Sequence, residues 1–309
     1  MKIAAIQINA DFANVAYNLD NAEKWIRKSV RAGAKLVVLP EFFTSAIGFS
    51  DKMFSAVSDN RRARDQMIQW AHSYNAIIGG SFLEFDGRNA YNMFLLCFPE
   101  GSIYEHKKDI PTQFENCYYT NGDTDHVLQT PIGNIGIALC WEMIRYDTVR
   151  RMNGNVDFVL AGSCWWDLPD GAPVERQPLR EYNQNLAAQT PARLAQILQV
   201  PVIHANHCGK ITAFSFPTAD RLQTRQLVGA TQIVSGQGEV LAAKAFSEGE
   251  GFVCAEIEWD SGKRKSVSCP EGYWIPDLPE SYLNAWNTLN PLGADYYQKT
   301  ALQRYQTDC

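Results

Sequence analysis

Short apolar segments alternate with amphipathic helical segments along most of this chain. Lys2–Ile8 and Lys35–Leu39 have the apolar character of buried strands, and Asn18–Ala32 between them carries apolar residues at helical spacing. Further helices are predicted at Arg61–Tyr74 and within Val174–Leu198. Further strands are predicted at Ala76–Phe85, Ala90–Phe98, Ile103–His106, Ile135–Leu139, Val156–Ala161, Val202–Ala205, Ala230–Val234, Glu239–Ala243 and Gly251–Glu258. Many strands with interleaved helices predict a layered α/β or α+β sandwich in one domain.

The pattern changes at about Gly262, where prolines and large aromatic residues become frequent. Such a composition is poorly suited to regular core elements. We therefore expect residues 1–261 to form the domain and residues 262–309 to form an extension. The extension is expected to pack on the domain or on a dimer partner.

The charge balance argues against several classes of partner. The chain has 309 residues, 46% of them hydrophobic, with 28 Lys and Arg against 34 Asp and Glu, which gives a net charge of −6. Nucleic-acid binding requires a concentrated basic surface, which this composition does not favour. No segment is apolar for long enough to span a membrane or to act as a signal peptide, so a cytoplasmic location is expected.

Metal and redox sites are also not predicted. The eight cysteines contain no C-x-x-C pair, and the histidines lack the spacing of metal ligands. We expect the protein to function without a metal ion or an organic cofactor.

Three potentially reactive side chains each follow an apolar strand. Glu41 comes after one predicted strand, Lys107 and Lys108 after another, and Cys140 directly after Ile135–Leu139. A cysteine attacks only as the thiolate, so it needs a base or a neighbouring cation. A partly desolvated carboxylate can serve as the base, and an ammonium group can stabilise both the thiolate and an oxyanion. Together the three types of side chain predict a cysteine-nucleophile enzyme.

The sequence resembles the nitrilase superfamily of carbon–nitrogen hydrolases, because several motifs of that family occur in it in the same order. The motifs are AAIQ from Ala4, LVVLPEFF from Leu36, YEHKKDIP from Tyr104, FENCYYTNGD from Phe114, IGIALCWE from Ile135, ANHCG from Ala205 and GQGEVLA from Gly236. The resemblance covers residues 1 to about 260. It implies a four-layer α-β-β-α sandwich that forms a homodimer or a higher homo-oligomer.

The resemblance also implies a Glu-Lys-Cys triad. It assigns Glu41 as the base and Cys140 as the nucleophile, with Glu115 as an assisting glutamate. Aligning Ile110-Pro111 with the Leu-Pro of the family motif assigns the lysine to Lys107. Because adjacent strand residues face opposite ways, we expect Lys107 rather than Lys108 to point into the pocket.

The sequence signals for substrate-contacting residues are weaker than those for the triad. Trp165 follows a predicted strand near the family's substrate-contacting region, and Phe43, Tyr119 and Trp141 are expected to add apolar walls. Arg145 has two interpretations. It could bind a substrate carboxylate, but a structural ion pair at a helix start is the preferred one.

The implied reaction is hydrolysis of a small amide or N-carbamoyl compound through a cysteine thioester, releasing ammonia or an amine. The sequence after Cys140, Trp141-Glu142-Met143-Ile144-Arg145-Tyr146, differs from both the nitrilase and the small-amidase patterns of the family. A true nitrilase and an acyltransferase on the same fold therefore remain alternatives. A non-catalytic scaffold is disfavoured by the intact triad. The sequence does not identify the substrate.

Overall fold

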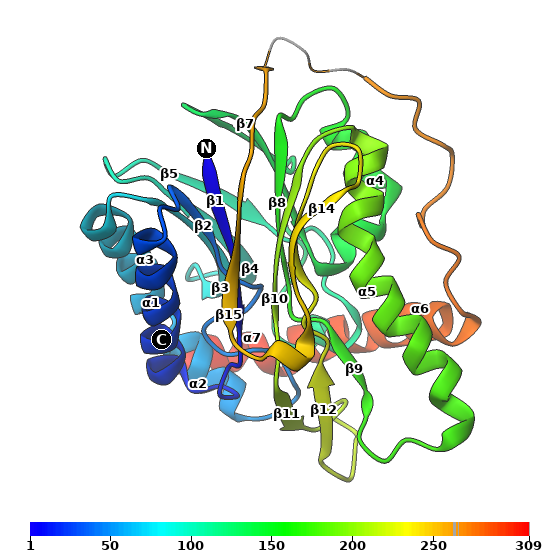
Figure 1. Cartoon of the computed structure of the whole chain (residues 1–309). Coiled ribbons are helices and arrows are strands. Elements are labelled where there is room, and N and C mark those ends of the chain that lie inside the picture. Colours follow the sequence, from blue (N-terminus) through cyan, green and yellow to red (C-terminus); the bar gives the residue numbers. More distant parts are fainter. Residues whose placement is uncertain (262–263, 265, 309) are drawn as a thin grey trace.

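The computed structural model describes residues 1–261, 264 and 266–308, and its central feature is a mixed sheet that folds back on itself (Figure 1). One half of this sheet has the strand order β5-β4-β3-β2-β1. These strands are β1 (Lys2–Ile8), β2 (Leu36–Val38), β3 (Ile77–Phe85), β4 (Ala90–Cys97) and β5 (Ile103–Lys107). β15 (Gly251–Glu256) pairs with β1 in antiparallel orientation.

The second half of the sheet has the order β10-β8-β7-β6, with β13 and β14 branching from β10. Its strands are β6 (Val127–Thr130), β7 (Gly133–Leu139), β8 (Phe158–Ser163), β10 (Val202–His207), β13 (Thr231–Val234) and β14 (Val240–Lys244). Among the described residues, the two halves are joined where the last residues of β1, Gln7 and Ile8, pair with Asn206 and His207 of β10. Away from this pairing, the two halves are separate layers, and their inner faces can pack against each other.

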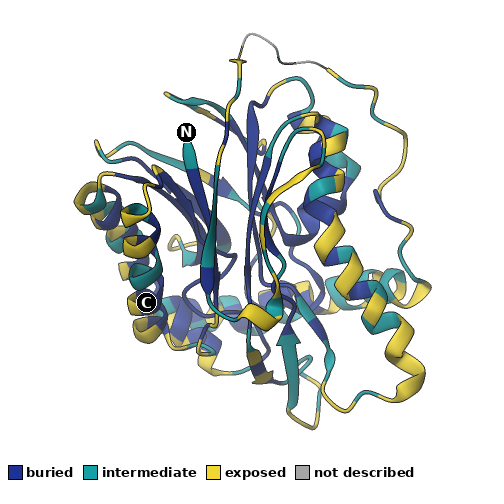
Figure 2. Cartoon of the chain, in the orientation of Figure 1, coloured by how far each residue is buried: buried dark blue, intermediate teal, exposed yellow. Residues whose placement is uncertain are grey.

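The packing produces four layers. Between the halves lies one apolar cluster, in which Ile3 and Val38 of the first half pack with Ile137 and Leu160 of the second. The outer face of the first half is covered by α1 (Val15–Arg31) and α3 (Arg61–Tyr74). The outer face of the second half is covered by α4 (Tyr146–Met152) and α5 (Gln177–Leu198). The predicted α-β-β-α sandwich is therefore confirmed. Figure 2 shows that the strands between the helical layers are largely buried.

Several smaller elements surround the sandwich. A separate three-stranded sheet has the order β11-β12-β9. Its strands are β9 (Trp166–Pro169), β11 (Lys210–Ala213) and β12 (Gln223–Leu227). The short helices are α2 (Lys52–Asp59), η1 (Gln113–Cys117), η2 (Cys140–Ile144), η3 (Val174–Arg176) and η4 (Phe246–Glu248). No helix in the described part of the chain is long and apolar enough to cross a membrane.

The C-terminal segment is more regular than its composition suggests. It contains α6 (Glu280–Tyr296), the π-helical turn η6 (Tyr297–Ala301) and α7 (Leu302–Asp308). α6 packs against η1, and its Trp286 stacks on Trp141 with ring centroids 5.7 Å apart. The expected domain boundary lies between residue 261 and residue 262, and residue 262 is outside the described residues. The prolines do not prevent this helix, because Pro279 lies at the helix start, where proline is tolerated, and Pro291 is accommodated inside α6.

Candidate active site

The potentially reactive side chains lie at the edge where the two halves of the sheet meet. Glu41 follows β2, Cys140 follows β7, and Cys164 follows β8. Since the ends of neighbouring parallel strands lie at one edge of a sheet, these residues are brought together. Gly162 in β8 permits the close approach, because a Cβ atom there would lie only 2.9 Å from the backbone nitrogen of Glu41.

A fully buried lysine joins two carboxylates at this edge. The Nζ atom of Lys108 lies 2.8 Å from Oε1 of Glu41 and 2.8 Å from Oε2 of Glu115. Burial lowers the pKa of Lys108, but the two carboxylates outweigh this effect and the net shift is well above the usual value. The ammonium form is therefore maintained at this position. We call Glu41, Lys108 and Glu115 the ionic triad.

The assignment of Lys107 to the site was wrong. Lys107 is the last paired residue of β5, and its Nζ atom lies 4.0 Å from the ring centroid of Tyr91 and 3.9 Å from Asp123. Side chains alternate along a strand, so buried His106 and buried Lys108 share the inner side, while Lys107 points outward. Anchoring the alignment on Ile110-Pro111 shifted the assignment by one residue.

Glu41 is completely buried and accepts three hydrogen bonds. Its Oε1 accepts from Lys108 and from Nδ2 of Asn92 at 2.9 Å, and its Oε2 accepts from the backbone N–H of Cys164 at 3.0 Å. Burial raises the pKa of Glu41 to about 7, against the opposing effect of Lys108 and with a smaller contribution from Glu115. A carboxyl group with this pKa exchanges protons readily at neutral pH.

Cys140 sits at a sharp turn between β7 and η2. Its φ of 51° lies in the left-handed region, which is uncommon for a residue with a side chain and is typical of constrained functional positions. Burial and then the Glu41 carboxylate raise the pKa of its thiol well above the usual value, although Lys108 acts in the opposite direction. The resting group is therefore a thiol that needs a base.

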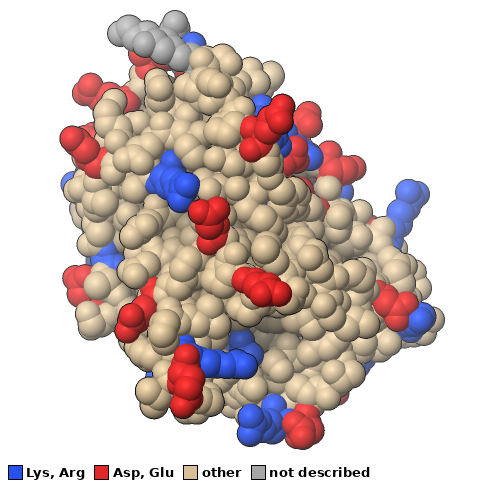
Figure 3. Space-filling model, turned by 90° about the vertical axis from the view of Figure 1, so that its right-hand side faces the viewer, with Lys and Arg blue, Asp and Glu red and all other residues tan. Residues whose placement is uncertain are grey.

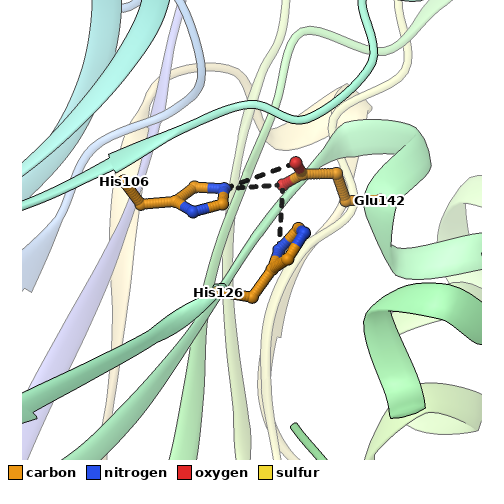
Figure 4. Close-up of side chains that lie close together, drawn as sticks. All are labelled: His106, His126 and Glu142. Atoms are coloured by element: carbon orange, nitrogen blue, oxygen red, sulfur yellow. Dashed lines mark hydrogen bonds and ion pairs between the residues drawn. The ribbon is translucent and has the colours of Figure 1, made fainter. Parts of the chain in front are cut away.

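A network of buried polar groups holds the turn after Cys140 (Figure 4). The Glu142 carboxylate accepts hydrogen bonds from the backbone N–H groups of Leu139 and Asp109, both at 2.7 Å. His106 Nε2 lies 3.2 Å from Oε2 of Glu142, and His126 Nδ1 lies 3.8 Å from the same oxygen. The carboxylate therefore fixes the chain on both sides of the nucleophile turn.

The same three side chains, His106, His126 and Glu142, are close enough together to be considered as metal ligands. However, Nδ1 of His126 is directed at the carbonyl oxygen of Ile137 at 3.0 Å, which requires it to carry a proton. Both oxygens of Glu142 already accept backbone hydrogen bonds. The donor set thus fits a hydrogen-bond network better than a metal centre. The absence of a metal requirement stays a prediction.

Arg145 forms the structural ion pair. Both terminal nitrogens of its guanidinium group bind the Asp109 carboxylate, and its Nε donates to the carbonyl of Trp141 at 3.2 Å. The side chain is 1% exposed. Since its donors are engaged in the protein interior, Arg145 does not line the cavity beside Cys140.

That cavity has a volume of about 350 Å³ and is lined by Cys140 and Glu115 at the reactive end. Trp141 and Trp165 form part of its wall, as the sequence predicted. Trp165 is held by its indole N–H, which donates to Asn183 of α5 at 3.0 Å. The size suits a small molecule. The C-terminal helix α6 contributes Ser281, Tyr282, Ala285 and Leu289 to the wall.

Two of the four predicted substrate contacts lie elsewhere. Phe43 packs in the core against Trp70 and Phe82, so its placement in the cavity wall was wrong. Tyr119 is buried behind the site, where its hydroxyl donates a hydrogen bond to Glu115. It supports the ionic triad from the side away from the cavity lining.

Sequence reasoning also missed residues that shape the site. Asn92, which binds Glu41, is a polar residue inside the apolar strand β4, and this unusual position was a usable signal. Asn183, Tyr282 and Arg225 line the cavity from distant elements, and no local motif marks them.

The side of the molecule on which α4 and α5 lie in Figure 1 carries charges of both signs. Figure 3 shows this face, on which acidic and basic side chains are interspersed. No broad field of a single sign is present on the drawn face. Recognition of a charged ligand by this face would therefore depend on individual groups.

Comparison with known proteins agrees with this geometry. The model of the carbon-nitrogen hydrolase family matches residues 2–264, and the chain belongs to this family. Nitrilase 3 of Arabidopsis thaliana is 30% identical over 282 residues, covering 84% of this chain and 79% of that protein. A cyanide hydratase of Botryotinia fuckeliana is 26% identical over 303 residues, covering 90% and 81%.

Solved structures share the fold. A carbon-nitrogen hydrolase from Helicobacter pylori has a TM-score of 0.72 and 18% identity, covering 84% of this chain and 89% of that chain. An amidase from Nesterenkonia has a TM-score of 0.67 and 16% identity, covering 84% and 91%.

The placement of the two lysines predicts losses of stability of very different size. Lys108→Met leaves two buried carboxylates without their cation, and we expect the free energy of unfolding to fall by about 3–5 kcal/mol. Lys107→Met removes a charge on a side chain that is 23% exposed, and it should cost less than about 1 kcal/mol. Urea denaturation at pH 8 measures both. A larger loss in the Lys107 variant would contradict the placement.

Proposed function

We propose that this protein hydrolyses a carbon–nitrogen bond in a small amide or N-carbamoyl compound, through a thioester on Cys140. The observation that carries the proposal is the shared location of Cys140 and Glu115 at one end of a cavity, with Glu41 and Lys108 buried next to them. Nucleophile, base and cation are thus present in one enclosed site. Membership of the carbon-nitrogen hydrolase family supports the same class of chemistry.

In the first half-reaction, Glu41 takes the thiol proton while the sulfur of Cys140 attacks the carbonyl carbon. The Lys108 ammonium stabilises the oxyanion, together with the backbone N–H of Trp141, which lies in the first turn of η2 and has no partner within that helix. The C–N bond then breaks, and Glu41 returns the proton to the leaving amine.

In the second half-reaction, Glu41 deprotonates a water molecule that attacks the thioester carbon. The C–S bond breaks, the carboxylic acid is released, and Cys140 regains its proton. Glu115 binds Lys108, the N–H of Thr112 and the hydroxyl of Tyr119, so its role in this proposal is to hold the lysine in place.

A nitrile is the second candidate substrate, because Nitrilase 3 and cyanide hydratase are among the relatives of this chain. Attack of the Cys140 sulfur on a nitrile carbon would form a thioimidate. Water would add to its carbon, and the resulting tetrahedral adduct would lose ammonia to give the same thioester. The contacts of the ionic triad are compatible with either substrate.

The decisive experiment measures ammonia release from matched amides and nitriles, such as propionamide and propionitrile. We expect faster release from the amide, and we expect Cys140→Ala to abolish the reaction. Cys164→Ala is the matched control, since only the backbone N–H of Cys164 contacts Glu41, and it should retain most of the activity. Faster turnover of nitriles would replace the amidase proposal with a nitrilase.

The raised pKa of Glu41 predicts the pH dependence. Glu41 must be ionised to act as a base, and its pKa of about 7 means that the protonated, inactive form accumulates below neutrality. We expect kcat/KM for a neutral amide to fall about tenfold per pH unit below pH 7 and to level off above it.

Glu115→Gln provides the internal control for this profile. It removes a negative charge that raises the pKa of Glu41, so the acidic limb should move to lower pH. A wild-type limb near pH 4.5, the ordinary value for a glutamate, would contradict Glu41 as the base.

A further inference from the structure

An arginine without a carboxylate partner lines the cavity on the wall formed by the small sheet. Arg225 lies in β12, and in the described part of the chain no carboxylate forms an ion pair with it. Its guanidinium group donates a hydrogen bond to Oε1 of Gln223 at 2.7 Å and stacks on the ring of Trp166, 4.8 Å from the ring centroid.

The strand pattern turns this arginine inward. Arg225 pairs with Ile211 across the antiparallel β11–β12 ladder, and directly opposed residues point to the same face. Ile211 is 4% exposed, and Leu227, two residues along β12, is fully buried. The guanidinium group is therefore on the core-facing side of the small sheet. Burial lowers the pKa of Arg225 to about 10, with no carboxylate raising it.

The acidic groups of the cavity wall cannot supply the missing partner. Glu115 is bound to Lys108, and Asp167 is buried and paired with Arg180 and Gln184. A partly buried cation without a counter-charge is unfavourable unless a ligand provides one. Arginine presents a planar fork that matches a carboxylate, and stacking on an aromatic ring orients that fork.

Resting on the proposed function, we propose that the substrate carries a carboxylate at the end away from the scissile group, and that Arg225 binds it. The substrate class is then a small ω-amide of an organic acid, held with its amide carbon at Cys140 and its carboxylate at Arg225. Arg225 is thus a specificity-determining residue at a position that sequence analysis assigned to no role.

The test compares monoamides of four- to six-carbon dicarboxylic acids (succinamate, glutaramate and adipamate) with their neutral diamides. With the wild-type protein, we expect kcat/KM for the best monoamide to exceed that of its diamide by tenfold or more. Arg225→Gln should remove this preference through a higher KM and leave the diamide within about threefold. Arg225→Lys keeps the charge without the fork, so its preference for the monoamide should lie between that of the wild-type protein and that of Arg225→Gln. Arg221→Gln is the matched control, because Arg221 is exposed just before the same strand.

A binding measurement separates this inference from the proposed hydrolysis. In a Cys140→Ala background, calorimetry should show that the best monoamide binds at least tenfold more weakly when Arg225 is also replaced by Gln, with no change for Arg221→Gln. If the monoamides bind in this manner but no amide is turned over, the hydrolase proposal fails and the anion site stands. Equal binding with and without Arg225, or no binding of any monoamide, overturns the inference.

Discussion

The site depends on two short ion pairs, which join Lys108 to Glu41 and to Glu115. Burying one ammonium group and two carboxylates is costly, and their mutual attraction offsets that cost only when the geometry is good. Here each carboxylate lies 2.8 Å from Nζ of Lys108. Glu41 has further donors, because Asn92 also donates to its Oε1 and the N–H of Cys164 donates to its Oε2. The architecture makes this possible because Glu41 follows β2, Lys108 follows β5, and Glu115 lies in η1 shortly after β5.

The arrangement gives the cysteine a base without an accompanying histidine. The ammonium of Lys108 is shared by two carboxylates, so burial still raises the pKa of Glu41 to about 7. The thiol of Cys140 also has a raised pKa, and the pair therefore rests as thiol and carboxylate. Proton transfer within the site would generate the thiolate only as the sulfur attacks.

Much of this could be predicted from local sequence patterns. Glu41 and Cys140 were identified because each follows an apolar strand and lies in a motif that resembles the family. The alternation of strands and helices predicted a layered sandwich, and the family resemblance implied its four layers. Lys107 was chosen over Lys108 because the alignment was anchored on Ile110-Pro111, and the sequence alone does not show which of two adjacent lysines faces inward. Phe43 was expected to add an apolar wall to the cavity, yet side chains two residues apart around a turn, such as Glu41 and Phe43, can face different layers. The helix α6 and the contact of Arg225 with the cavity depend on long-range packing, which leaves no local signature.

The central claim, a covalent intermediate on Cys140, is tested most directly by stopping the reaction with acid during turnover of an amide. Mass spectrometry of the intact protein, followed by peptide mapping, would then locate any acyl group. The account predicts a mass increase equal to the acyl group, carried by the peptide that contains Cys140. An acyl group on Cys164 instead, or rapid turnover by the Cys140→Ala variant, would contradict it.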